Sequence, residues 1–219
     1  MTPADAEIIF CDLDGTIVDS HPGIYRCLRI ALPEIGLGHL TDEQIRAILG
    51  PPLHYSLKEV HGKNDEDVDR FIVKYRSVYF GGGEYEFEVY PGMDQLLRDI
   101  AASDRTLVLA TAKPIESATR VLTKAGLLDY FDAVSGSELD LRRQGKADVI
   151  AHGLDLVGAR ADVSAVMIGD RKEDILGAHA HGFMSIGAQW GYGDEDELAN
   201  AHPSVTVNNA DELRHVLGL

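Results

Sequence analysis

Short apolar runs recur along the chain, and each ends in polar residues or glycine. The runs are Ile8–Cys11, Leu107–Ala110, Ala165–Ile168 and Met184–Gly187, with shorter ones at Ala133–Ser135 and Val205–Val207. Continuous apolar runs of this length are typical of strands that are buried on both faces of a parallel sheet. Helical periodicity lies between them. The sequence therefore predicts an α/β fold with a doubly wound (Rossmann-like) parallel sheet.

The interval between the first two long runs is too large for an ordinary strand-to-helix connection, which usually has about 2–6 residues. Its sequence has helical signals instead. Pro22 suits the first turn of a helix, Thr41–Gln44 has the pattern of a capping box, and Gly50 suits a helix end. Asp65–Phe80 has apolar residues at helical spacing. We therefore expect an inserted helical domain.

The inserted domain ends near a run of glycines. Gly81–Gly83 and the acidic and aromatic stretch Glu84–Glu88 follow the second helical segment. Glycine runs interrupt helices, so we interpret this segment as a linker that returns to the core. The predicted domains are an α/β core of residues 1–19 and 88–219 and an all-helical cap of residues 20–87.

Composition and charge restrict the partners of the chain. The 219 residues are 45% hydrophobic and 26% charged. No apolar run approaches the roughly 18 residues that a membrane span needs. The net charge of −16 repels nucleic acid, so we expect neither a membrane nor a nucleic acid as partner. A monomer and a small homo-oligomer suit the composition equally. The segment Met1–Glu7 has no basic patch before an apolar stretch, which predicts a cytoplasmic protein.

Two other features have a structural interpretation. The chain contains only two cysteines, Cys11 and Cys27, without the density of a disulfide scaffold or the spacing of a zinc site. We expect Cys11 to be a small buried apolar residue. The segment Trp190–Gly193 is interpreted as a turn after the last strand of the core.

Polar residues with useful chemistry follow three of the expected strands, namely Asp12, Thr111 and Asp170. Active sites in parallel α/β sheets lie at the carboxyl ends of the strands. Asp14 is two residues from Asp12, and a turn at Gly15 can bring both carboxylates to this edge. Glycine also allows main-chain N–H groups to approach an anion closely.

Carboxylates held this near to each other need a positive partner. Two such groups repel, and the pKa of one rises unless a cation lies between them. Magnesium prefers oxygen ligands, usually one or two carboxylates with water and phosphate oxygens. The sequence therefore predicts an Mg²⁺ site to which Asp12 and Asp170 contribute.

Four motifs resemble those of the haloacid dehalogenase (HAD) superfamily, in the same order. They are Phe10–Thr16, Thr111 within Leu109–Pro114, Lys146 within Gly145–Asp148, and the acidic Ile168–Asp174 of the type Gly-Asp-x-x-x-Asp. The resemblance covers nearly the whole chain. The helical insert is similar to the C1-type cap of the subfamily that contains phosphoglycolate phosphatases, certain nucleotidases and β-phosphoglucomutases.

The resemblance implies a role for each matching residue. Asp12 would be the nucleophile that forms an aspartyl-phosphate, and Asp14 would protonate the leaving oxygen and later activate water. Thr111 and Lys146 would complete the catalytic set. The metal ligands would be Asp12, Asp170 and the main-chain carbonyl group of Asp14.

The phosphate group would have its own set of contacts. The residues expected to bind it are Gly15, Thr111, Ala112, Lys113 and Lys146. Asp174 would act on the metal through water or orient its neighbours.

The resemblance implies a hydrolase that acts on small phosphomonoesters, similar to phosphoglycolate phosphatase or to a broad sugar-phosphate and nucleotide phosphatase. Dehalogenases and phosphonate-cleaving relatives lack a carboxylate at the position of Asp14, so this residue favours phosphoester chemistry. Two alternatives stay open. One is a phosphomutase similar to β-phosphoglucomutase, and the other is a module that binds a phosphorylated ligand without catalysis.

Several residues have two interpretations. Gly50–Leu53 is either a loop that faces the site or a stiff connection between helices. Lys146 could be a surface charge, with Arg142 or Arg143 entering the site in its place. His21 and Arg46 are candidates for substrate contact, although each is more often a solvated surface residue.

Overall fold

The computed structural model describes residues 2–49, 56–138, 143 and 145–219. The chain forms two compact units. The first, which we call the α/β unit, consists of Met1–Asp19 and Glu88–Leu219. The second, which we call the helical unit, consists of Ser20–Phe87.

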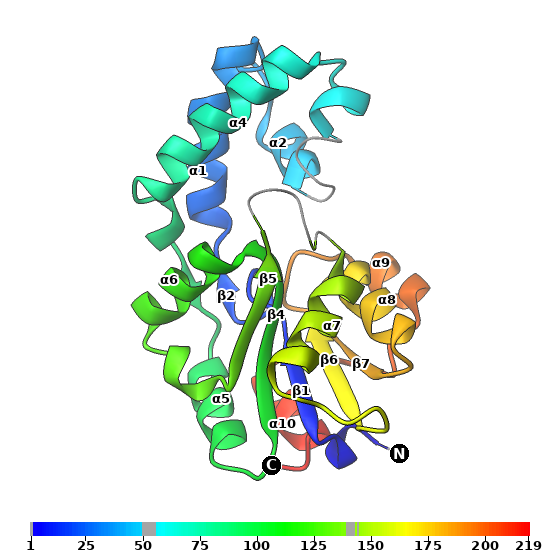
Figure 1. Cartoon of the computed structure of the whole chain (residues 1–219). Coiled ribbons are helices and arrows are strands. Elements are labelled where there is room, and N and C mark those ends of the chain that lie inside the picture. Colours follow the sequence, from blue (N-terminus) through cyan, green and yellow to red (C-terminus); the bar gives the residue numbers. More distant parts are fainter. Residues whose placement is uncertain (1, 50–55, 139–142, 144) are drawn as a thin grey trace. The chain divides into compact units, whose positions relative to one another are not determined.

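A six-stranded parallel sheet forms the centre of the α/β unit (Figure 1). Its strands, in sheet order, are β5 (Ala133–Ser137), β4 (Thr106–Pro114), β1 (Ile8–Cys11), β6 (Ala165–Gly169), β7 (Met184–Ala188) and β8 (Val205–Val207). All four residues of β1 are buried, as expected for a central strand. The chain winds outward from β1 in both directions, which creates a switch point beside β1. The predicted doubly wound α/β fold is confirmed.

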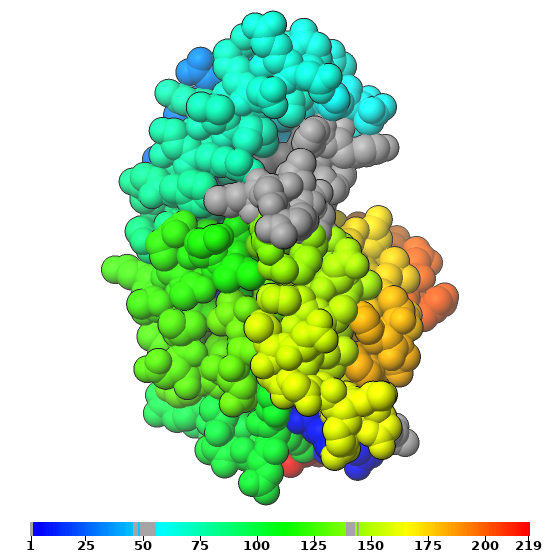
Figure 2. Space-filling view, in the orientation of Figure 1, coloured from blue at the N-terminus to red at the C-terminus, as the bar shows by residue number. Residues whose placement is uncertain are grey.

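Helices cover both faces of this sheet. They are α5 (Met93–Ala101), α6 (Ile115–Ala125), α7 (Lys146–Leu156), α8 (Lys172–Ala180), α9 (Glu195–Ala201) and α10 (Ala210–Val216), with short 3-10 helices η1 (Pro3–Asp5) and η5 (Leu128–Tyr130). Helices α7 and α8 lie side by side over one face, and their outer surface is yellow-green to orange-yellow in Figure 2. Gly153 lets α7 approach the sheet, since a Cβ there would lie 2.8 Å from Cε1 of Phe10.

Strand β4 extends further than the apolar run predicts. It continues through Thr111 to Pro114, with a shift of register against β5 between these two residues. Thr111 therefore lies within the strand rather than after it. The expectation was wrong because polar residues at the carboxyl end of a strand mark the functional edge of the sheet and not the end of hydrogen bonding.

Two short segments also differ from the sequence-based expectation. Gly83–Tyr85 forms a 3-10 helix, η4, and Glu88–Val89 forms β3, which pairs antiparallel with β2 (Val18–Asp19). The expected linker is thus partly regular, and strands of two residues are too short to give a periodic signal. The turn Trp190–Gly193 follows β7, but β8 comes after it, so β7 is not the last strand of the sheet.

The regular elements described in the helical unit are all helical. They are α1 (His21–Ala31), η2 (Leu32–Ile35), α2 (Asp42–Leu49), the π-helical η3 (Ser56–Val60), α4 (Asp65–Phe80) and η4. The predicted capping box is confirmed. The Thr41 N–H donates to Oε1 of Gln44 at 2.9 Å, and the Gln44 N–H donates to Oγ1 of Thr41 at 3.3 Å. The predicted helix end at Gly50 and the segment Gly50–Leu53 lie outside the described residues.

An apolar cluster of its own stabilises the helical unit. It joins Leu28 and Leu32 to Ile45, Leu57 and Phe71, all of them buried. Burial of side chains of this size contributes about 1.5–3 kcal/mol each before the loss of conformational entropy is subtracted. Across the described ranges of both units, no helix has the length and apolar character needed to cross a membrane.

Candidate active site

Three aspartates meet at the carboxyl edge of the sheet. Asp12 follows β1 and Asp170 follows β6, and these strands are direct neighbours with Cys11 opposite Ile168. Asp174 lies in the first turn of α8. One carboxylate oxygen from each of them lies within 4.8 Å of those of the other two, and all three residues are buried. The topology thus gathers negative charge where solvent does not screen it.

Lys146 lies among these carboxylates. It is the first residue of α7 and is only 7% exposed, which excludes the interpretation as a surface charge. Its Nζ donates to Oδ1 of Asp12 at 2.8 Å and to the Ala110 carbonyl oxygen at 2.9 Å. It also forms an ion pair with Oδ1 of Asp174 at 2.7 Å, without the alignment of a hydrogen bond. Burial acts to lower the pKa of Lys146, but Asp12 and Asp174 outweigh it and raise this pKa.

One lysine does not balance three carboxylates. Burial, followed by the charges of Asp174 and Asp12, raises the pKa of Asp170 to about 8. Burial also raises the pKa of Asp174 to about 6, although Lys146 opposes the shift. Such shifts indicate carboxylates that lack sufficient positive charge nearby.

Asp14 lies apart from this cluster and contacts a second lysine. Lys113, from the end of β4, donates its Nζ to Oδ1 and Oδ2 of Asp14 at 2.8 and 2.7 Å. The Lys113 side chain is 5% exposed and that of Asp14 is 22% exposed. The described residues of the site therefore include two separate lysines with acidic partners, Lys146 with Asp12 and Asp174, and Lys113 with Asp14.

Gly15 brings the loop after β1 against Asp170. Its φ is +87°, and a Cβ at this position would collide with the Asp170 carboxylate. Gly15 was expected among the phosphate-binding residues, and in the structure its N–H donates to the carbonyl oxygen of Val18 at 2.8 Å. The glycine here permits a tight turn and a close approach to Asp170.

The remaining residues expected at the phosphate lie on β4. Thr111 is buried, and its Oγ1 accepts a hydrogen bond from the Lys113 N–H at 3.2 Å. Ala112 is exposed. Thr111 follows Ala110, whose carbonyl oxygen accepts a hydrogen bond from Lys146. Strand β4 therefore contributes Lys113 to the site and also contacts Lys146.

Two residues that the sequence interpretation left out hold Asp170. The Thr16 hydroxyl donates to Oδ1 of Asp170 at 3.0 Å, and the Tyr192 N–H donates to Oδ2 at 2.7 Å. Thr16 belongs to the first motif, whereas Tyr192 lies in the turn after β7. The only sequence signal for this turn is a pair of glycines around an aromatic residue, directly after a buried strand.

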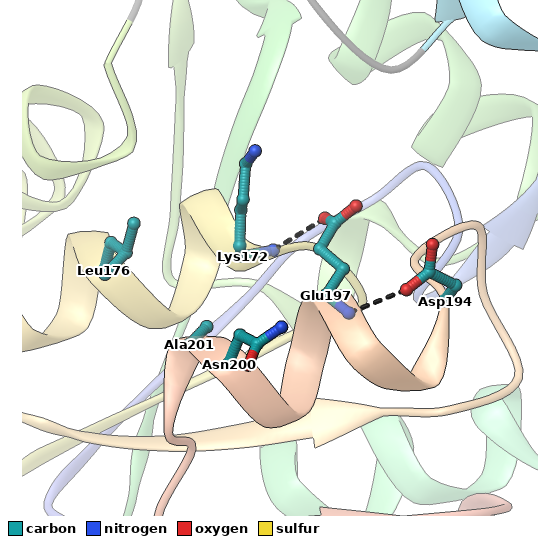
Figure 3. Close-up of a pocket in the computed structure, with 6 residues that line it drawn as sticks. All are labelled: Lys172, Leu176, Asp194, Glu197, Asn200 and Ala201. Atoms are coloured by element: carbon teal, nitrogen blue, oxygen red, sulfur yellow. Dashed lines mark hydrogen bonds between the residues drawn. The ribbon is translucent and has the colours of Figure 1, made fainter.

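The start of α8 is fixed by contacts on both sides. The Arg171 N–H donates to Oδ2 of Asp174 at 3.1 Å. On the outer side, Glu197 of α9 accepts from Nε of Arg171 at 2.7 Å and from the Lys172 N–H at 3.0 Å, the latter shown in Figure 3. Burial opposes ionisation of Glu197, but these hydrogen bonds outweigh it and lower its pKa. The shallow pocket in Figure 3 lies beside Glu197 and includes none of the clustered aspartates.

The other candidates belong to other elements or lie outside the described residues. His21 is the first residue of α1 in the helical unit, and Arg142 and the side chain of Arg46 are outside the described part. Arg143 pairs with Glu138 and donates to the Gly136 carbonyl oxygen at 3.3 Å. Cys11 is buried as predicted, and burial together with Asp12 raises its pKa.

The donor set fits a hard divalent cation. Asp12, Asp170 and Asp174 offer carboxylate oxygens within a small buried volume. The raised pKa of Asp170 indicates that the described contacts leave negative charge uncompensated. Magnesium and similar ions bind through oxygen ligands of this kind.

A doubly wound sheet with buried acids and a buried lysine at its carboxyl edge defines an α/β enzyme. Residues 8–188 match the family model described as haloacid dehalogenase-like hydrolase. This match spans well over half of the chain, so the chain belongs to that family, and the resemblance found in the motifs is confirmed.

Several individual members of the family are similar to this chain over most of its length. The chain is 34% identical to the 5'-nucleotidase of Pseudomonas aeruginosa over 95% of this chain and 94% of that protein. It is 34% identical to the tyrosine-protein kinase PtkA of Mycobacterium tuberculosis, over 97% of this chain and 73% of the relative. The phosphoglycolate phosphatase of Aliivibrio fischeri is 26% identical over 98% of this chain and 96% of that protein.

A solved structure of another protein has the same fold. The crystal structure of a predicted phosphatase from Clostridium acetobutylicum superposes with a TM-score of 0.89 at 34% identity, covering 98% of this chain and 99% of that one. These comparisons support a HAD-like hydrolase that acts on phosphomonoesters.

Proposed function

We propose that the chain is a magnesium-dependent phosphatase that hydrolyses small phosphomonoesters through an aspartyl-phosphate on Asp12. The observation that carries this proposal is the buried cluster of Asp12, Asp170 and Asp174, with Lys146 bound to two of them. Asp12 is the nucleophile because its carboxylate follows the central strand and borders both the metal-binding acids and the lysine.

Magnesium would be held by Asp12, Asp170 and the main-chain carbonyl group of Asp14. When bound, it would neutralise the negative charge that opposes attack by a carboxylate on a phosphate dianion. The two hydrogen bonds that Asp170 accepts from Thr16 and Tyr192 fix its orientation and leave lone pairs available. Asp174 has a different role in this proposal, since it contacts Lys146 and caps α8, so it orients Lys146.

In the first chemical step, an Asp12 carboxylate oxygen attacks phosphorus and the bond from phosphorus to the ester oxygen breaks. Asp14 gives a proton to the leaving oxygen. In the second step, Asp14 takes a proton from water, the water oxygen attacks phosphorus, and the acyl-phosphate bond to Asp12 breaks. Dividing a slow hydrolysis into two displacements is the usual benefit of covalent catalysis.

The two lysines and Thr111 bind the transferring group. Lys146 and the Thr111 hydroxyl would donate to phosphoryl oxygens, where fixed donors stabilise developing charge. Lys113 pairs with Asp14 in the structure at 2.7 Å. A bound phosphate dianion would compete for this ammonium group and release Asp14 to exchange a proton. Ala112, which is exposed beside Thr111, would offer its main-chain N–H.

The helical unit would serve as a cap that selects the leaving group. Relatives named as a 5'-nucleotidase and a phosphoglycolate phosphatase point to nucleoside monophosphates and phosphoglycolate as the first substrates to examine. Both are small phosphomonoesters. We place the enzyme in the cytoplasm, as a monomer or a small homo-oligomer.

The test is phosphate release from nucleoside monophosphates, phosphoglycolate, sugar phosphates, pyrophosphate and phosphotyrosine, each with Mg²⁺ and with a chelator. We expect Mg²⁺-dependent release from at least one small monoester. A hexose 1-phosphate that isomerises without releasing phosphate would identify a phosphomutase. Tight ligand binding with background turnover across the panel would identify a non-catalytic module.

A further inference from the structure

The turn Trp190–Gly193 contacts three distant parts of the α/β unit. The Trp190 Nε1–H donates to the Thr16 carbonyl oxygen at 3.1 Å. The Tyr192 N–H donates to Oδ2 of Asp170 at 2.7 Å, and the Tyr192 hydroxyl donates to Oδ1 of Asp19 at 3.0 Å. One turn thus joins the nucleophile loop, a metal-binding carboxylate and the end of β2.

Glycines allow this turn to approach so closely. A Cβ on Gly191 would collide with Cβ of Asp170 and with the Gly15 carbonyl oxygen, and a Cβ on Gly193 would collide with the Asp170 carbonyl oxygen. Neither glycine has a positive φ, so the requirement at both is space and not backbone conformation. The turn therefore packs directly against Asp170.

The other end of the contact lies where the chain leaves the α/β unit. Asp19 is the last residue before the helical unit, and it pairs across β2 and β3 with Glu88, the first residue after that unit. Tyr90, just beyond β3, packs edge-on against Trp190 with ring centroids 6.4 Å apart. The turn therefore touches both connections to the helical unit from within the α/β unit.

We infer that the turn Trp190–Gly193 is a positioning element, in which Tyr192 holds Asp170 ready for the metal and links it to Asp19 at the connections. This inference rests on the proposed function, because it assigns Asp170 to the metal. The physical basis is the restraint that hydrogen bonds place on the carboxylate. A carboxylate with both oxygens hydrogen-bonded cannot rotate freely, and a metal that binds it also restrains the group that donates to it.

The first test is Mg²⁺ binding to Gly191→Ala, with Gly187→Ala on β7 as the matched control. A Cβ on Gly187 would meet only Cγ2 of Thr206 at 3.3 Å and other side chains away from Asp170. Partners of metal ligands typically change affinity by about 10–100-fold when altered, so we expect Gly191→Ala to weaken binding at least tenfold. Calorimetry measures the affinity, and emission of Trp190, the single tryptophan, reports the turn itself. Wild-type affinity in Gly191→Ala would overturn the inference.

The second variant, Tyr192→Phe, folds with little risk because only one hydroxyl is lost. It keeps the main-chain N–H, so Mg²⁺ affinity should stay within about twofold of wild type. In wild type, Mg²⁺ should slow amide exchange of residues 18–19 and 88–89, and Tyr192→Phe should abolish this response. Tyr130→Phe, on η5, should retain it. An unchanged exchange response in Tyr192→Phe would overturn the link.

Failure of this inference can be distinguished from failure of the proposed function. If wild-type protein binds no Mg²⁺ and releases no phosphate, the proposed function fails. If wild type does both and Gly191→Ala binds Mg²⁺ equally well, only the role of the turn is contradicted.

Discussion

The catalytic edge of the α/β unit and the core of the helical unit are built from opposite kinds of contact. At the edge, Lys146 and three aspartates are buried together, and glycines permit backbone to pack on Asp170. In the helical unit, apolar residues are buried and ion pairs such as Arg26 with Glu86, at 2.6 Å, are left largely exposed. Exposed pairs of this kind are screened by solvent and contribute little to stability. The edge is arranged for charge, and the helical core is arranged for stability.

The largest effect should come from Asp12→Asn. Removing the nucleophile should lower kcat by at least about 10³-fold, as expected when a covalent mechanism loses its attacking group. Stability should not fall, because Asn has the same shape and the buried cluster loses one of its excess negative charges. Phosphate release and thermal unfolding measure the two effects. Retained activity would contradict the mechanism. A large loss of stability would contradict the claim that Asp12 serves catalysis and not stability.

Phe71→Ala should have the reverse profile. Phe71 is fully buried and stacks on Tyr75 with ring centroids 5.9 Å apart. Its removal leaves a cavity that should cost about 3–5 kcal/mol in the free energy of unfolding of the helical unit. Mg²⁺ affinity, set within the α/β unit, should not change. Chemical denaturation followed by amide exchange locates the loss, and a weakened metal site would show that the two regions are not independent.

Lys146→Met tests how much the buried charges of the catalytic edge affect stability. It leaves Asp12 and Asp174 buried without their shared partner, and breaking such a pair costs about 3–5 kcal/mol. We expect a loss near the lower end, about 3 kcal/mol, because protonation of the aspartates relieves part of it. Urea unfolding with a chelator measures this, and Mg²⁺ should restore part of the stability. No destabilisation would mean that the cluster is better solvated than its burial indicates.

Thr41→Ala should have the smallest effect. The capping box of α2 would lose the hydrogen bond from the Gln44 N–H, at a cost of about 1 kcal/mol. Thermal unfolding of the helical unit measures it, with Thr41→Ser as a control that keeps the acceptor oxygen. If Thr41→Ala lost as much stability as Phe71→Ala, the claim that apolar packing stabilises the helical unit would be contradicted.

The same contrast explains what the sequence could predict. Asp12 and Asp170 lie in local motifs directly after buried strands that are neighbours in the sheet, and Lys146 lies in a local motif at the start of α7. Helices such as α4 could be predicted because apolar spacing and caps are local signals. Thr16 and Tyr192 were missed because their contacts with Asp170 depend on how the chain folds and not on spacing.

Other differences have the same origin. The pair of Lys113 with Asp14 was not predicted, because no motif spacing encodes a contact between β4 and the loop after β1. The pairing of β2 with β3 joins Val18 to Val89 and Asp19 to Glu88, which are far apart in the sequence, and it involves only two residues on each strand, too few for a pattern.

The stereochemical course at phosphorus tests the central claim most directly. Each in-line displacement inverts the configuration of the transferred group, so attack by Asp12 followed by attack by water restores it. With a substrate made chiral at phosphorus by oxygen isotopes and sulfur, we predict release of inorganic thiophosphate with overall retention. Inversion would show direct attack by water and would contradict an aspartyl-phosphate on Asp12.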